Sequence, residues 1–409
     1  MKNFFIKTLG CKTNQIEGQL ISQNMLENGF EKSPTVTDAD IYILNSCAVT
    51  HHAEAQANYL LGQAKRLNPN IKTILCGCMP QTNKDDIKNA DIILGNTEKL
   101  NIVDYLNKSS VNDIFNEDKF SFHILKSSSS TRPSIKIQDG CNNRCAYCII
   151  PYARGKSRSN SIKNILDQIN TLKPKEIVLT GIHLGQWGQD FNLKLIDLLK
   201  EIEKTDILRY RLGSLYVNEI DDELLNFLLN SKKFCPHFHL SLQSMCDKTL
   251  KNMNRFYTVE DVFNLTNKLR FDVPVFIGCD VIVGFPGETE EDFETTYHNL
   301  IKAGVNKIHV FPYSKRKGTK AYDMDNQVQE NTKTNRAKKL TILSTALYKK
   351  FVKSNMDLEH EFIFEKKSIK TGLNCGVTKN YIKAFFKGET DLKGSFKKIK
   401  LKDAYKIDF

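Results

Sequence analysis

The sequence predicts an α/β protein in three parts: a parallel α/β domain, a central partial barrel and a small C-terminal antiparallel β-barrel. Three observations predict this architecture. Strand-like and helix-like segments alternate in residues 1–125, and six further strand–helix pairs occupy residues 134–353. Residues 355–409 instead show short alternating runs separated by glycines, which is typical of small antiparallel barrels.

Composition limits the class of protein and its location. A chain of 409 residues, 40% of them hydrophobic, can fill two or three domain cores. Lys7 interrupts the apolar run that a signal peptide needs, and no apolar run approaches the roughly 20 residues of a membrane span. We therefore expect a cytoplasmic protein with no membrane association, in which the eleven cysteines stay reduced. The net charge of +12 favours a nucleic-acid partner, although a solvated basic surface explains it equally well.

In residues 1–125 a cysteine follows each of the first three predicted strands. Strands are expected at residues 4–8, 41–45, 73–76 and 91–94, with helices at 15–27 and 54–67. Because the carboxyl ends of parallel strands share one edge of a sheet, Cys11, Cys47 and Cys78 can converge there as a metal site. Three small core residues are the alternative. Cys76, two residues before Cys78, is expected to lie buried within its strand.

Residues 134–353 follow a polar linker at 126–133 and should form six strand–helix units. The strands are expected at 135–137, 176–180, 208–212, 238–242, 277–283 and 307–311, and a long helix at 332–352 closes the series. A closed barrel of this type has eight units, so six units predict a partial barrel. Its lateral opening would admit a macromolecular substrate.

The tail combines the barrel pattern with strong positive charge. Alternating runs at residues 361–365, 381–385 and 395–401 predict its strands. From Lys366 onward there are twelve lysines and four acidic residues, so this segment carries +8 of the net charge. Tyr381, Phe385 and Phe386 lie among the lysines, a combination typical of RNA-binding surfaces. An ordinary core with a solvated lysine face is the alternative.

The chemistry centres on the loop Cys141-Asn-Asn-Arg-Cys145-Ala-Tyr-Cys148, which follows the first strand of the central part. Structural zinc takes four protein ligands, and a 4Fe-4S cluster has four irons to ligate. Three cysteines leave one iron open for a small molecule, which suits catalysis. A zinc site completed by Cys235 or a histidine is the alternative.

This spacing, with an aromatic before the third cysteine, resembles the radical S-adenosylmethionine (SAM) superfamily. With Thr8-Leu-Gly-Cys-Lys-Thr-Asn14, Asn45-Ser-Cys-Ala-Val-Thr50 and Gly77-Cys-Met-Pro-Gln81, the chain resembles the methylthiotransferases of that superfamily. Further segments carry the same resemblance: Leu179-Thr-Gly-Ile-His-Leu-Gly185, Leu242-Gln-Ser244, Met253-Asn-Arg-Phe-Tyr-Thr258 and Asp280-Val-Ile-Val-Gly-Phe-Pro-Gly-Glu288. The tail is similar to the RNA-binding TRAM domain of these enzymes.

The resemblance implies two 4Fe-4S clusters and SAM as cofactors. It assigns the catalytic cluster to Cys141, Cys145 and Cys148, and the second cluster to Cys11, Cys47 and Cys78. The residues that it implies for cofactor binding are Tyr147, Gly181, Gln243, Gly284 and Gly287. The last two let a ligand approach the backbone closely, with a plain turn after a strand as the alternative.

The family has three substrate branches: threonylcarbamoyladenosine or isopentenyladenosine beside the tRNA anticodon, and an aspartate of a ribosomal protein. Gly181-Ile-His-Leu-Gly185 and Ile149-Ile-Pro-Tyr-Ala-Arg-Gly155 most resemble the threonylcarbamoyladenosine (t6A) branch. The implied reaction inserts a methylthio group at carbon 2 of that adenine. This unactivated C–H bond requires a 5′-deoxyadenosyl radical from the first cluster, while the second presents the sulfur.

The expected partners are the tRNA anticodon stem-loop, an electron donor such as a flavodoxin or ferredoxin, and a sulfur source. Two other readings stay open: radical methylation without sulfur insertion, and a non-catalytic iron–sulfur or zinc protein that binds RNA. Arg154, Lys156 and Arg158 flank the cysteine loop, where they could hold phosphates or a carboxylate; a solvated basic loop is the alternative. We interpret His51 and His52 as residues at a helix start and not as ligands.

Overall fold

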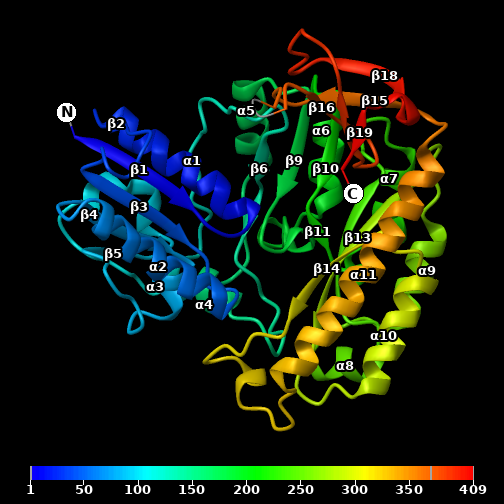
Figure 1. Cartoon of the computed structure of the whole chain (residues 1–409), viewed down its shortest axis with the longest axis horizontal. Coiled ribbons are helices and arrows are strands. Elements are labelled where there is room, and N and C mark those ends of the chain that lie inside the picture. Colours follow the sequence, from blue (N-terminus) through cyan, green and yellow to red (C-terminus); the bar gives the residue numbers. More distant parts are fainter. Residues whose placement is uncertain (1, 369–370, 409) are drawn as a thin grey trace.

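The computed structural model describes residues 2–368 and 371–408 (Figure 1). Its N-terminal part is a five-stranded parallel sheet in the order β2-β1-β3-β4-β5. The strands are β1 (Asn3–Thr8), β2 (Glu31–Lys32), β3 (Ile41–Ser46), β4 (Lys72–Gly77) and β5 (Ile92–Leu94). The four strands expected here are confirmed, and β2 is a short edge strand that the sequence pattern did not reveal.

Helices α1 (Lys12–Glu27) and α2 (His51–Leu67) pack on opposite faces of this sheet. Ile41 and Ile43 of β3 belong to the core under α1, whereas the alternate residues Tyr42 and Leu44 belong to the core under α2. Every residue of β3 is therefore buried, as expected for a strand covered on both faces. α2 begins at His51, with Thr50 as its N-cap, so the prediction that His51 and His52 start a helix is confirmed.

The central part holds two parallel sheets whose strands follow one another in chain order. The first contains β6 (Ser134–Lys136), β9 (Glu176–Thr180) and β10 (Arg209–Leu212). The second contains β11 (Ser214–Leu215), β12 (His237–Gln243), β13 (Phe276–Val283) and β14 (Lys307–Pro312). Only Gly213 separates β10 from β11, so the two sheets adjoin there. All six strands expected in this part are confirmed.

Helices alternate with these strands and enclose the largest hydrophobic core of the described chain. They are α5 (Ile162–Leu172), α6 (Leu195–Glu203), α7 (Asp222–Asn230), α9 (Val259–Lys268), α10 (Glu290–Lys302) and α11 (Glu330–Asn355). α5 shows the principle, because Ile165 and Ile169 are spaced by one helical turn and both are buried in this core. Figure 1 shows α9, α10 and α11 along the outer side of the central strands.

The tail forms a five-stranded antiparallel sheet in the order β18-β15-β16-β17-β19. The strands are β15 (Glu359–Phe364), β16 (Asn374–Thr378), β17 (Lys383–Phe386), β18 (Phe396–Lys400) and β19 (Lys406–Ile407). The sequence pattern missed β16, whose polar and glycine residues hide the fact that the whole strand is buried. Tail and central part share a core, in which Phe276 and Phe351 pack with Phe362 and Phe386.

Within residues 2–368 and 371–408, no helix combines the length and the apolar character that crossing a membrane requires. The longest, α11, carries lysines along its length.

Candidate active site at the junction of two cysteine loops

Cys141, Cys145 and Cys148 lie on one loop between β7 (Gln138–Asp139) and α4 (Ile150–Arg154). Gly140 makes the turn into this loop with a φ of +74°, and a Cβ there would lie 1.8 Å from the Lys156 carbonyl oxygen. Only glycine fits this close approach. Backbone hydrogen bonds then fix the loop, because the Cys141 N–H donates to Gly155 and the Cys148 N–H donates to Cys145.

Buried polar side chains surround two of these three thiols. The Cys141 sulfur lies 3.2 Å from Nδ1 of His183, and the Cys145 sulfur lies 3.5 Å from Nη1 of Arg255. The Arg255 guanidinium also stacks on Tyr216, 3.7 Å from the ring centre. A cation held against thiols stabilises their charged form, which is the form that binds metal.

The sequence interpretation missed His183, Tyr216 and Arg255 as residues of the site. His183 and Arg255 lie in segments that carry the family resemblance, so the signal for these two was available. Tyr216 lies in the turn after β11, and no motif in the sequence around it indicates a role in the site. Only the fold brings these three side chains to the cysteine loop.

The three sulfurs of the loop influence one another electrostatically. Burial, together with the charges of Cys145 and Cys141, raises the pKa of Cys148 to about 12. A thiol in this position gives up its proton readily only when a cation or metal compensates the charge. The loop thus offers three mutually close sulfur donors, the donor set of an iron–sulfur site with one position left open.

The second set of cysteines converges at the carboxyl edge of the N-terminal sheet. Cys11 caps the start of α1, Cys47 directly follows β3, and Cys78 begins α3 (Cys78–Thr82) directly after β4. β1, β3 and β4 are neighbours and end in register, which brings the three loops together. A Cβ on Gly10 would lie 3.0 Å from the Cys47 sulfur, so the first loop touches the second.

The thiols of this second set also lie close enough to interact. Burial, together with the charges of Cys78 and Cys11, raises the pKa of Cys47 to about 11. Arg154 is the nearby cation, since the charge of Cys78 raises the pKa of its guanidinium. In the described part of the chain, no three Cys, His, Asp or Glu side chains already stand in a metal-binding arrangement. The donor chemistry of each trio nevertheless fits an iron–sulfur cluster.

Cys76 lies apart from this set, although it is only two residues from Cys78. Its side chain is fully buried in the core between β4 and α1, and burial raises the pKa of its thiol to about 12. The prediction that Cys76 is buried within its strand is confirmed.

The two cysteine trios are neighbours in space. α3 packs against α4, and the side chains of Ala48, Cys78, Ile149 and Ala153 form a small buried cluster between them. Ala48 follows Cys47 and Ile149 follows Cys148, so this cluster joins both sites directly. Asn96 adds a polar link, donating from Nδ2 to the Ala153 carbonyl at 2.6 Å and lying 3.8 Å from the Cys78 sulfur.

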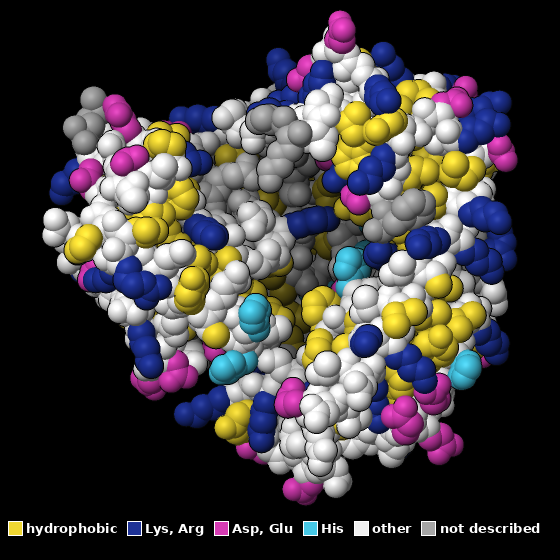
Figure 2. Space-filling model, in the orientation of Figure 1, with side chains coloured by type: hydrophobic (Ala, Val, Ile, Leu, Met, Phe, Trp, Pro, Cys, Tyr) yellow, Lys and Arg dark blue, Asp and Glu magenta, His cyan; other side chains and the backbone are white. Residues whose placement is uncertain are grey.

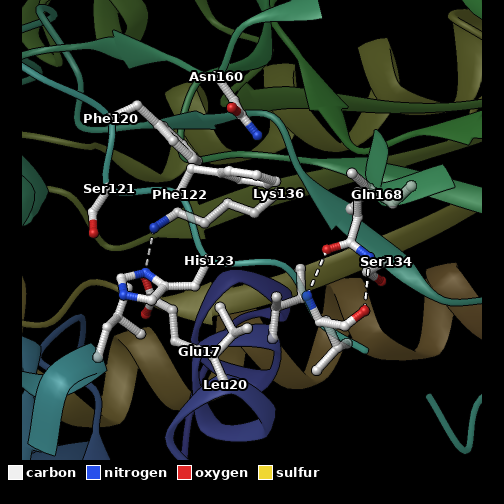
Figure 3. Close-up of a pocket in the computed structure, with 14 residues that line it drawn as sticks. Glu17, Leu20, Phe120, Ser121, Phe122, His123, Ser134, Lys136, Asn160 and Gln168 are labelled. Carbon is white, nitrogen blue, oxygen red and sulfur yellow. Dashed lines mark hydrogen bonds and ion pairs between the residues drawn. The ribbon is translucent and has the colours of Figure 1, made fainter. Parts of the chain in front are cut away.

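A buried ion network holds the two halves of the site together. Glu17 of α1 is 1% exposed, and its carboxylate lies 2.6 Å from both Arg154 and Lys136 and 2.5 Å from Lys99. Burial alone would raise the pKa of Glu17, but these three cations hold it well below its usual range. Figure 3 shows Glu17 and Lys136 meeting across this interface, beside a cavity of about 30 Å³ that suits water and no larger ligand.

The network changes the interpretation of the basic residues after the cysteine loop. Arg154 and Arg158 are buried, and the carbonyls of Glu117 and Arg154 accept hydrogen bonds from Arg158. Neither arginine is a solvated loop residue, nor is it free to hold a phosphate. Lys156 is exposed and pairs with Asp118 at 3.4 Å.

The residues expected to bind the cofactor occupy different surroundings. Tyr147 packs at the edge of a buried cluster that contains Phe285, which connects it to the turn at Gly284. Gly284 and Gly287 have φ values of +73° and +80° after β13, and the Gly284 N–H donates to Glu288. Gln243 ends β12 with a φ of +61°.

Gly181 lies elsewhere, at the wall of a cavity of about 680 Å³ between the three parts of the chain. Figure 2 shows a central hollow with basic and histidine side chains at its wall. Residues that line the cavity come from α1, the central strands and the tail, and include Cys11, Lys12, Gly181, His239, Lys307 and Tyr381.

Comparisons with known proteins agree with this geometry. The family model described as "Radical SAM superfamily" matches residues 135–300, and the one described as "Uncharacterized protein family UPF0004" matches residues 3–95. The chain has the fold of radical SAM enzymes: the methyltransferase TsrM from Kitasatospora setae superposes with a TM-score of 0.55 at 11% identity, covering 76% of this chain and 73% of that one. The fold and the site therefore define the chain as a radical SAM protein.

Similar sequences narrow the class further. The threonylcarbamoyladenosine tRNA methylthiotransferase MtaB of Bacillus subtilis (strain 168) is 36% identical over 96% of this chain and 92% of its own length. The protein of that name from Aquifex aeolicus (strain VF5) is 36% identical over 92% and 94%. The tRNA-2-methylthio-N(6)-dimethylallyladenosine synthase of Clostridium tetani is also 36% identical, over 82% and 80%. The chain belongs to the methylthiotransferase family of radical SAM enzymes.

Proposed function

We propose that this enzyme inserts a methylthio group at carbon 2 of N6-threonylcarbamoyladenosine next to the tRNA anticodon. One observation supports the proposal most strongly. Two three-cysteine sites, each of which would leave one iron of a 4Fe-4S cluster without a protein ligand, lie next to each other where α3 packs against α4. Relatives named for the t6A reaction are 35–37% identical to this chain, and those named as dimethylallyladenosine synthases are 33–36% identical, so sequence similarity favours the t6A branch by a small margin.

We assign three domains to this function. Residues 1–125 would carry the second cluster, residues 134–353 a partial (βα)6 barrel, and residues 355–409 a TRAM-like barrel that binds RNA. The chain order of β6 to β14 supports the partial barrel, and the five antiparallel neighbours β18-β15-β16-β17-β19 in the tail support the last assignment. Cys141, Cys145 and Cys148 would hold the catalytic 4Fe-4S cluster, and Cys11, Cys47 and Cys78 the second one.

When bound, the cofactors supply a carbon radical from SAM at the first trio and a transferable sulfur at the second. The protein holds and shields them. Arg255 would offset negative charge at Cys145, while Ile149, Ala48 and Ala153 keep water out of the space between the sites. Tyr147, Gly181, Gln243, Gly284 and Gly287 remain our candidates for contact with SAM.

The tail would supply RNA affinity through its lysines more than through its aromatic residues. Phe386 is buried in the tail core and Tyr381 faces the internal cavity, so the expected mixed aromatic–lysine surface is only partly present. Lys397 and Lys398 of β18 are exposed. Replacing both by alanine should lower tRNA affinity and flatten its salt dependence by up to about two charges, as measured by binding between 50 and 200 mM salt.

Two readings remain as alternatives. Radical methylation without sulfur insertion would leave the convergence of Cys11, Cys47 and Cys78 unexplained. A non-catalytic RNA-binding protein would not require an open ligand position at two sites. An electron donor such as a flavodoxin or ferredoxin, a sulfur source and a cytoplasmic location follow from the proposed reaction.

Nucleoside mass spectrometry tests the proposal directly. Transfer RNA from cells that lack the chain and from cells that express it should differ in 2-methylthio-N6-threonylcarbamoyladenosine. Appearance of the isopentenyl product alone would move the enzyme to the other tRNA branch. Absence of any methylthio product, with both clusters present, would overturn the proposed reaction.

A further inference from the structure

The 680 Å³ cavity contains more positive than negative charge. Three carboxylates face it, and each lies within 4 Å of a basic side chain. The pairs are Asp280 with His239 at 3.0 Å, Glu365 with Arg132 at 2.6 Å, and Asp408 with Lys383 at 3.5 Å. Glu365 and Asp408 are therefore neutralised by an arginine and a lysine, whereas Asp280 is neutralised only while His239 is protonated.

Two lysines that line the same cavity have no such partner. Lys12 lies in the first turn of α1, and Lys307 begins β14. Across residues 2–368 and 371–408, neither ammonium group forms an ion pair, and Lys307 instead lies 4.7 Å from the centre of the Tyr348 ring. Two cations without an ion-pair partner in this solvent-open cavity favour an anionic ligand.

The charges of the two lysines act on the same space. Burial lowers the pKa of His309, which lines the cavity, and the charges of His239, Lys307 and Lys12 lower it further. Asp280 works in the opposite direction without reversing the shift. Both lysines therefore act on the same ring, although burial and His239 contribute more to the lowered pKa of His309.

The start of α1 adds to the positive potential. Cys11, Lys12 and Thr13 all line the cavity, so the N-terminus of this 16-residue helix faces it. Cys11 is the N-cap and its side chain caps no backbone N–H group. The positive end of the helix dipole therefore reinforces the charge of Lys12.

We propose that Lys12 and Lys307 bind a carboxylate on the N6 substituent of the target adenosine and so select the substrate branch. The inference rests on the proposed function. The threonylcarbamoyl group carries one carboxylate, whereas the isopentenyl group is neutral and apolar. The cavity is large enough to admit this substituent, and Cys11 at its wall places the group beside the second cysteine site.

The test compares three tRNA anticodon stem-loops that differ only in the adenosine: t6A, its neutral methyl ester and unmodified adenosine. Reconstituted enzyme should bind the acid about tenfold or more tightly than the ester in fluorescence anisotropy. The Lys12→Met/Lys307→Met double variant should bind both equally, whereas Lys12→Arg should keep the preference. Because phosphate contacts are common to all three RNAs, the affinity ratio isolates the carboxylate.

Two controls keep the test decisive. Lys232→Met removes an exposed lysine outside the cavity and should leave the ratio unchanged. Lys307→Met alone, far in sequence from every cysteine of either trio, should lower the ratio at least threefold even if Lys12→Met impairs iron binding. An undiminished ratio in Lys307→Met and in the double variant would overturn the inference. Conversion of t6A without any preference for acid over ester would overturn it while leaving the proposed function intact.

Discussion

The two cysteine sites of this enzyme are built in opposite ways. Cys141, Cys145 and Cys148 lie on one loop that Gly140 and local backbone hydrogen bonds shape. Cys11, Cys47 and Cys78 come from three loops that meet only because β1, β3 and β4 are adjacent and end in register. The first site depends on local geometry, and the second depends on the whole N-terminal sheet.

This difference indicates which structural changes would disrupt each site. A local loop tolerates small shifts of distant elements, since its ligands move together. The second site also depends on how the N-terminal sheet docks against α4, which the Glu17 network and the Ala48–Ile149 contact maintain. A change at this interface should therefore impair sulfur delivery before it impairs radical formation.

The largest expected effect separates the two sites by single substitutions. Cys145→Ala should abolish both methylthio product and 5′-deoxyadenosine release, because we propose that the first site binds SAM for reductive cleavage. Cys47→Ala should abolish the product but retain 5′-deoxyadenosine release under a strong reductant. One assay that reads both products measures this division. Sulfur insertion by Cys47→Ala would favour the simple methylase reading.

A smaller effect is expected from the buried network between the sites. Glu17→Gln leaves Arg154, Lys136 and Lys99 without their shared carboxylate, and breaking such a buried pair costs about 3 kcal/mol. Since the folded-state pKa of Glu17 is lowered, its stabilisation is complete above the unfolded value of about 4.3 and is lost as pH falls through the folded value. Denaturant unfolding near pH 7 measures the loss.

Glu223→Gln provides the matched control, because Glu223 is exposed and pairs with the exposed lysines Lys194 and Lys200. It should leave the unfolding midpoint unchanged. Equal midpoints for Glu17→Gln and the unchanged protein would show that the network does not hold the interface.

The sequence predicted the helices and strands better than it predicted the contacts between them. Strand alternation and the loop spacing located β6 to β14 and both cysteine trios, because those signals are local or follow from parallel strand order. The docking of α3 on α4 left no local signal. Arg154 illustrates the limit. As a basic residue beside the cysteine loop, it was expected to face solvent or to hold a phosphate. It is instead buried and pairs with Glu17, which lies 137 positions away in the sequence.

The smallest expected effect concerns Cys76. Its substitution tests whether closeness in sequence or closeness in space determines which cysteines are ligands of the second site. Cys76→Ala removes one sulfur from a tight core and should cost about 1 kcal/mol of stability. Its iron content and product formation should stay unchanged, whereas Cys78→Ala should lose the second cluster. If Cys76→Ala loses iron while Cys78→Ala retains it, the assignment of ligands is wrong.

Iron content tests most directly the central claim that two separate three-cysteine sites each hold a cluster. Anaerobically reconstituted protein should bind about eight irons if both clusters are 4Fe-4S. Triple alanine replacement of Cys141, Cys145 and Cys148 should leave about half of that iron, and so should triple replacement of Cys11, Cys47 and Cys78. About four irons in the fully reconstituted, unmutated protein would contradict the account.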